Sequence, residues 1–182
     1  MRGRRRAPAD VRADHGLIED PQVVLEAALR FLEVRQRSAA EVRRRLLLHG
    51  YRPGMADAAI ERLTELGMLD DAAFAQAWIE SRDRARPRGE RALRRELAIK
   101  GIERDVVDGT LAEREAQAPD ADAEAARRLL ERNARALARV PDLRSRRQRA
   151  YLLLARNGFD PEIAATVSRS LDRGDEAELP DP

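Results

Sequence analysis

The side chains in this sequence with the strongest chemical character are arginines, which recur in three clusters. Residues 30–45 carry six arginines against two glutamates, a local charge of +4. Residues 82–104 and 127–149 carry local charges of +5 and +7, although the whole chain has a net charge of only +2. Guanidinium groups bind phosphates and carboxylates, so the clusters predict a positive stripe that would bind a polyanion or a strongly acidic protein. The alternative is a set of solvated helix faces in a chain that prefers arginine, since Lys100 is its only lysine.

Residues that could support catalysis are scarce. Asp70 and Asp71 are adjacent carboxylates that could bind Mg²⁺, but nothing else in the chain completes such a site, so helix capping is the favoured interpretation. His15 and His49 have no partner cluster, and the chain has no cysteine. A glycine-rich phosphate loop and a Gly-x-Ser-x-Gly elbow are also missing. We therefore expect no enzyme, no cofactor, and no catalytic, cofactor-binding or metal-binding residues.

The elements that must position the arginines repeat along the chain. Gly50, Gly101 and Gly158 are about fifty residues apart, and each follows an amphipathic stretch rich in arginine. The apolar spacing is helical throughout, and the 3% aromatic content argues against a sandwich or barrel. The sequence predicts an all-α fold: a tandem array of three three-helix, helix-turn-helix-like repeats that forms an elongated, curved molecule.

Breaks in the pattern give the expected domain boundaries. The repeats span residues 21–67, 68–115 and 124–172, with a polar linker at 116–123. Residues 1–20 form a basic arm that we expect to be disordered, either an unselected tail or a nucleic-acid-binding arm. Residues 173–182 form an acidic tail. Each 45-residue unit alone buries little apolar surface, so stacking of the repeats or docking on a partner is expected to add burial.

Local signals mark where helices begin and end. Asp20 before Pro21 and Asp160 before Pro161 are N-cap and N1 signals, and Ser38 with Glu41 reads as a capping box. The three glycines suit left-handed helix ends. We expect Phe74 and Trp78, four residues apart, to be anchors of the core. No apolar run is long enough to cross a membrane, so we expect no membrane contact. The absence of cysteine is consistent with an intracellular location, and we expect a monomeric cytoplasmic protein.

Several segments resemble RecX regulatory proteins. The stretch from Ala28 to Leu46 is similar to the opening of that family, and the stretch from Leu66 to Ala75 is the most specific match. Residues 89–102 resemble the second repeat of the family, and residues 148–164 the third. The resemblance covers roughly residues 21–172. The 112–124 joint departs from the family pattern because it is long, acidic and rich in alanine, and the arm and the tail match no family feature.

This resemblance implies tandem three-helix repeats that lie in the groove of the RecA–DNA filament. It also implies inhibition of the ATPase, strand-exchange and co-protease activities of RecA. The expected partners are then the RecA filament and single- and double-stranded DNA, bound weakly or through the filament.

Two other hypotheses remain open: a DNA-binding protein of helix-turn-helix-like repeats that acts without RecA, and a helical scaffold whose arginines only confer solubility. The candidate contact residues are cations of the middle helices and the turns next to them: Arg35, Arg37, Arg44, Arg45, Arg91, Arg94, Arg95, Lys100, Arg146, Arg147 and Arg149.

Overall fold

The computed structural model describes residues 8–171, with side chains from residue 12 onward, and this part of the chain contains helices and no strands. The all-α class is therefore confirmed. Two compact units emerge, one made of residues up to 75 with 99–103, the other of residues 76–98 with those from 104 onward. The helices are α1 Pro8–Gly16, α2 Pro21–Leu32, α3 Ala39–Leu48, α4 Pro53–Glu65, α5 Asp71–Ala85, α6 Glu90–Ile99, α7 Arg104–Gln117, α8 Ala121–Arg132, α9 Ala134–Ala138, α10 Leu143–Arg156 and α11 Pro161–Arg169.

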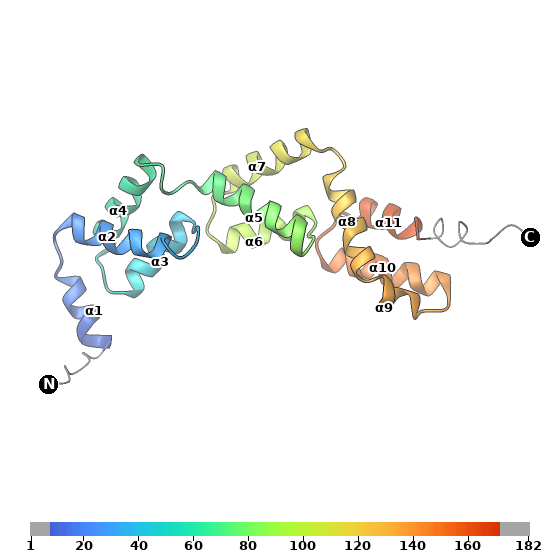
Figure 1. Ribbon diagram of the computed structural model, residues 1–182, viewed down its shortest axis with the longest axis horizontal. Coiled ribbons are helices and arrows are strands. Elements are labelled where there is room, and N and C mark those ends of the chain that lie inside the picture. Colours follow the sequence, from blue (N-terminus) through green and yellow to red (C-terminus); the bar gives the residue numbers. More distant parts are fainter. Residues whose placement is uncertain (1–7, 172–182) are drawn as a thin grey trace, which may run out of the picture. The chain divides into compact units, whose positions relative to one another are not determined.

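The first unit is built on α2, α3 and α4, which pack against one another (Figure 1). Their apolar residues recur three or four positions apart and so share the inward face of each helix. Val24, Val42, Leu46 and Leu63 are completely buried in this core. The expected N-caps form as well: the carboxylate of Asp20 and the hydroxyl of Ser38 each accept a backbone N–H of the following helix.

The second unit contains a core in which α8, α10 and α11 pack together. Leu154 and Phe159 are buried there, and Asp160 caps α11 through the N–H of Glu162 at 2.8 Å. The predicted left-handed helix ends are confirmed, with φ values of 97° at Gly50, 80° at Gly101 and 85° at Gly158. The local stop and start signals thus fix these helices as the sequence indicates.

In the middle repeat, ion pairs tie each pair of helices together. Arg82 of α5 contacts Glu96 of α6 at 2.6 Å, and the indole N–H of Trp78 donates to the same carboxylate at 2.9 Å. Arg94 of α6 pairs with Asp108 of α7. Trp78 is half-buried, so its expected place in the core is wrong; its polar N–H needs an acceptor, and Glu96 provides one.

Within the first unit, α3 of the first repeat begins against the turn after α6. The Ser38 hydroxyl donates to the Lys100 carbonyl at 2.6 Å, and the Ala39 N–H donates to Asp71 at 2.9 Å. A Cβ atom added at Gly101 would collide with the Cβ atom of Ala40. We call this contact the first joint; it satisfies backbone donors that a helix N-terminus leaves unpaired.

The second unit repeats this contact between the start of α6 and the turn after α10. The Gly89 N–H donates to the Asn157 carbonyl at 3.1 Å, and the Glu90 N–H donates to Asp122 at 3.1 Å. A Cβ atom added at Gly158 would collide with Ala92 near the start of α6. We call this contact the second joint. In both joints an aspartate in the first turn of the next repeat accepts a backbone N–H.

Residues 8–16 correct the expectation of a disordered arm over residues 1–20, because they form α1; residues 1–7 lie outside the described part. The His15 Nδ1–H donates to the His49 carbonyl at 2.7 Å, and its ring stacks on Tyr51 with centroids 4.5 Å apart. A Cβ atom added at Gly50 would collide with the Arg12 carbonyl. The helix therefore sits on the Gly50 turn much as α3 and α6 sit on the later glycines.

The predicted linker at 116–123 is too long. Helix α7 continues to Gln117 and α8 begins at Ala121, because Arg114 and Asp122 form an ion pair across the turn at 2.8 Å. The tail at 173–182 lies outside the described residues.

The third repeat also holds more helices than the expected three, since α8 ends at Arg132 and a short α9 follows. The side-chain amide of Asn133 donates to the Leu129 carbonyl where the helix breaks. Helix α10 begins one turn earlier, relative to its glycine, than the middle helices of the other repeats. Asp142 caps it through the Ser145 N–H, and the Arg146 N–H is used inside the helix, donating to the Asp142 carbonyl.

Candidate functional site

The cations of the first repeat differ in how much of their charge is available. Arg44 of α3 is exposed and has no hydrogen-bond or ion-pair partner among residues 12–171. Arg45 is exposed and its guanidinium carbon lies 5.4 Å from the centre of the Phe31 ring. Arg37 donates to the Phe31 carbonyl at 2.7 Å, so it has no carboxylate there to offset its charge.

Glu41 pairs with two of the predicted contact residues. Its carboxylate accepts hydrogen bonds from Arg35 at 3.0 and 3.2 Å and from Lys100 at 2.8 Å. Burial raises the pKa of Glu41, but the hydrogen bonds from Arg35 and Lys100 outweigh it and lower this pKa to about 2. A carboxylate held ionised in this way keeps both cations in place at the first joint. Arg35 and Lys100 therefore stabilise the first joint, and their charges are already paired with the Glu41 carboxylate.

Helix α6 carries two arginines that pair with carboxylates and one that does not. Arg94 contacts Glu90 at 2.7 Å and also Asp108, and these hydrogen bonds raise the pKa of Arg94. Arg91 pairs with Asp160 at 3.2 Å. Arg95 is exposed and forms no hydrogen bond or ion pair within the described part of the chain.

Helix α10 carries the last three candidates. Arg146 and Arg147 are half-buried, and Arg146 donates to the Val140 carbonyl at 3.1 Å. Arg149 is exposed and lines a shallow hollow together with Leu152 and Arg156. No carboxylate lines this hollow, so its charge is positive.

Three of the eleven predicted cations thus share one property: they are exposed on a middle helix and have no partner in residues 12–171. They are Arg44 of α3, Arg95 of α6 and Arg149 of α10. Arg44 and Arg95 occupy equivalent positions, each six residues before the glycine that ends its helix. Four others pair with carboxylates and stabilise the fold: Arg35, Arg91, Arg94 and Lys100.

Sequence reasoning missed the aliphatic side chains that accompany these cations. Leu48 of α3, Ile99 of α6 and Leu152 of α10 are large apolar residues with 56%, 73% and 46% of their surface exposed. The spacing carried a signal, because Leu48 and Ile99 each lie four residues after an unpaired arginine and so share its helix face.

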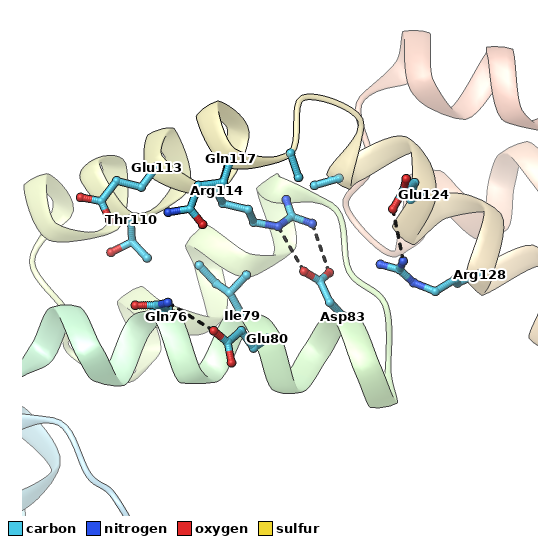
Figure 2. Close-up of a pocket in the computed structure, with 12 residues that line it drawn as sticks. Gln76, Ile79, Glu80, Asp83, Thr110, Glu113, Arg114, Gln117, Glu124 and Arg128 are labelled. Carbon is cyan, nitrogen blue, oxygen red and sulfur yellow. Dashed lines mark hydrogen bonds and ion pairs between the residues drawn. The ribbon is translucent and has the colours of Figure 1, made fainter.

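A hollow of about 240 Å³ lies among α5, α7 and α8 of the second unit (Figure 2). Arg114 of α7 reaches across it to Asp83 of α5, as Figure 2 shows, at 3.1 Å for both contacts, and pairs with Asp122 at 2.8 Å. Burial lowers the pKa of Arg114, but hydrogen bonds to Asp122 and Asp83 outweigh it and the net shift is upward. Arg114 therefore forms ion pairs with both aspartates, and these contacts connect α5, α7 and α8.

The described residues hold no group of three or more histidines and carboxylates arranged to bind a metal ion. The Asp70 carboxylate instead accepts the Ala73 N–H at 2.9 Å, which confirms its capping role. Between residues 8 and 171 no helix is long and apolar enough to span a bilayer.

Family models match both of the first two repeats. The model of the first three-helix domain of RecX matches residues 25–63, and that of the second three-helix domain matches residues 70–111. These ranges contain all eight of the predicted cations in repeats one and two. They leave the third repeat to comparison with whole proteins.

Whole-length relatives and solved structures agree. A regulatory protein RecX from Mycobacterium avium is 34% identical over 139 residues, which is 76% of this chain and 79% of the relative. A regulatory protein RecX from Chlorobium phaeobacteroides is 31% identical over 85% of this chain and 95% of its own. The crystal structure of RecX from Lactobacillus salivarius has a TM-score of 0.74 at 21% identity and covers 85% of this chain and 98% of that one, which supports the same fold. The chain belongs to the RecX family of regulatory proteins.

Proposed function

We propose that this protein binds the RecA filament on DNA and inhibits its ATPase, strand-exchange and co-protease activities without catalysing a reaction. In this proposal the protein acts as a monomer in the cytoplasm, where filament and DNA are found. It touches DNA weakly or through the filament. The named regulatory relatives support the general role, and the arginines of the middle helices support the contact with a polyanionic nucleoprotein.

The observation that carries the proposal is the recurrence of exposed, unpaired arginines on α3, α6 and α10. Arg44, Arg95 and Arg149 have no partner to offset their charge within residues 12–171. An arginine without a carboxylate partner is free to form charge-assisted hydrogen bonds to phosphate or to an acidic protein surface. Repetition on three helices suits a long partner better than a small ligand.

The direct test is the rate of ATP hydrolysis by RecA on single-stranded DNA as this protein is added. We expect the rate to fall as the protein approaches the concentration of filament binding sites. An unchanged rate at several-fold excess would overturn the proposal.

A matched set of variants tests the role of the unpaired arginines. The triple variant Arg44→Ala, Arg95→Ala, Arg149→Ala should inhibit RecA at least about tenfold less well, since each lost charge contact weakens binding. The control removes three exposed arginines that already pair with carboxylates, Arg43→Ala, Arg62→Ala and Arg104→Ala. The control should inhibit like the parent protein, and an equal loss in both would show that overall charge, not this set, matters.

The second candidate function is DNA binding without RecA, which the same exposed arginines favour. It predicts tight binding to duplex DNA alone, with affinity that falls steeply as salt rises because neutralised phosphates release counterions. Binding that requires RecA would reject this candidate. Equal binding to DNA with and without RecA would favour it.

A further inference from the structure

The middle helices pair an exposed cation with an exposed aliphatic side chain. On α3 the two are Arg44 and Leu48, four residues apart and therefore on one face of the helix. On α10 the order is reversed: Leu152 is 46% exposed, and Arg156 follows four residues later.

Helix α6 follows the order of α3, with Ile99 four residues after Arg95. In all three helices the two positions lie six and two residues before the glycine that ends the helix. The Nε–H of Arg156 donates to the Leu152 carbonyl at 3.2 Å, a backbone contact that leaves the charge of the guanidinium without a carboxylate.

The aliphatic member of each pair distinguishes between classes of partner. A phosphate backbone attracts the cation but offers little apolar surface to cover a leucine or isoleucine. A protein surface with a carboxylate beside an apolar patch satisfies both members, and removal of exposed aliphatic area from water favours binding. The recurrence of a cation beside an aliphatic residue on three helices, with the two members exchanged on α10, suits a partner that presents such patches more than once.

We propose that these three cation–aliphatic pairs dock on identical protein subunits of a polymer, each subunit offering carboxylates next to an apolar patch. This inference rests on the proposed function and deepens it. The pairs contact the protein component of the nucleoprotein filament, and DNA affinity comes from other cations. We refer to the six residues as the docking pairs: Arg44 with Leu48, Arg95 with Ile99, and Leu152 with Arg156.

The test changes only the aliphatic members, so that the charge of the protein stays constant. The variant Leu48→Ser, Ile99→Ser, Leu152→Ser is compared with Leu17→Ser, Val34→Ser, Leu66→Ser, a control that alters exposed apolar residues elsewhere, with 74%, 78% and 48% of their surface exposed. Filament binding is measured by fluorescence anisotropy of labelled full-length protein, binding to DNA alone in parallel, and folding by thermal unfolding.

We expect the docking-pair variant to bind the filament at least about tenfold more weakly than the control variant. Its thermal midpoint and its affinity for DNA alone should equal those of the control variant. Unchanged filament binding in that variant would overturn the inference. A parallel loss of binding to DNA alone would also overturn it and assign the pairs to nucleic acid, and a change of oligomeric state would assign them to self-association. If the parent protein itself failed to bind the filament, the proposed function would fail and this inference with it. If the parent and the docking-pair variant bound the filament equally well, only this inference would fail.

Discussion

Glu41 illustrates how one residue can take a role that its local pattern does not reveal. Its spacing from Ser38 fits a capping box, and the Ser38 hydroxyl does accept the Glu41 N–H at 3.1 Å. The Glu41 carboxylate instead holds Arg35 and Lys100, the latter 59 residues away. Capping depends on neighbours along the chain and is visible in sequence, whereas this contact depends on how repeats stack.

The Glu41→Gln variant tests that contact through pH. The pKa of Glu41 is lowered from 4.5 to about 2 in the folded protein, so its ionised form stabilises the fold above pH 4.5 and this stabilisation is lost as pH falls toward 2. We expect the variant to lose about 2 kcal/mol of unfolding free energy at pH 7. Chemical denaturation at several pH values should show the two proteins converging in acid, and a constant difference between pH 7 and pH 2.5 would contradict this role.

His49 gives a second pH prediction, at the contact with α1. Burial lowers the pKa of His49, and the charges of Arg45, His15 and Arg12 lower it further. The folded state therefore favours the neutral ring, so the stabilisation is complete above pH 6.5 and is lost as pH falls below it. The thermal midpoint of the parent should drop between pH 7.5 and 5.5 by more than that of His49→Gln. Equal drops would show that His49 does not couple protonation to folding.

Arg114 is the residue whose removal should cost most among the ion pairs. The Arg114→Ala variant leaves Asp83 and Asp122 without their cation in a largely buried place, and breaking such a pair costs about 3 kcal/mol. Arg62→Ala, which removes an exposed pair with Glu65, should cost less than about 0.5 kcal/mol. Unfolding in urea measures both, and similar small losses would show that Arg114 is not a brace.

At the scale of elements, local signals predicted most helices and missed the contacts between them. Asp20, Ser38, Asp160 and the capping glycines act through bonds within a few residues, so their effects can be read from the sequence. Helix α1 has a weak apolar pattern and is held by Gly50 and its neighbours, more than thirty residues away. The shortened linker likewise depends on an ion pair that spacing alone does not reveal.

A pair of glycine substitutions tests the first joint. Gly101 and Gly67 both have positive φ, 80° and 67°, so alanine pays the left-handed cost of about 1 kcal/mol at either position. A Cβ atom at Gly67 meets nothing within 4 Å, whereas at Gly101 it meets Ala40. Gly101→Ala should therefore lose about 2 kcal/mol more than Gly67→Ala in chemical denaturation. Adding Ala40→Gly should recover part of the difference; no recovery would mean that the contact at the joint is not the cause.

At the scale of the whole molecule, the three basic clusters and the repeat were predictable because they need only composition and period. Which arginines are available could not be predicted, because it depends on carboxylates brought close by folding. Arg94 and Arg95 are neighbours in sequence, yet Arg94 pairs with Glu90 and Asp108 while Arg95 pairs with nothing in residues 12–171. The candidate site is accordingly a subset of the cations that the sequence indicates.

These neighbours allow a clean comparison within one helix. Arg95→Glu should weaken filament binding and leave the unfolding free energy within about 0.5 kcal/mol, because it is an exposed substitution. Arg94→Ala should lower the unfolding free energy by up to about 1 kcal/mol, since its partners are partly solvated, with a smaller effect on binding. Titration against the filament and denaturation of each variant separate the two effects, and the reverse assignment would contradict the distinction drawn between them.

The early start of α10 changes what the third repeat can offer to a following module. Arg146 lies twelve residues before Gly158, just as Ser38 and Gly89 lie twelve residues before Gly50 and Gly101. The Ser38 hydroxyl and the Gly89 backbone N–H each donate to a carbonyl of the adjoining turn. The N–H of Arg146 is already engaged by the Asp142 carbonyl. A further module after residue 171 would therefore find this backbone N–H engaged, unlike that of Gly89 in the second joint. A joint of the second kind at this place would require α10 to lose its first turn.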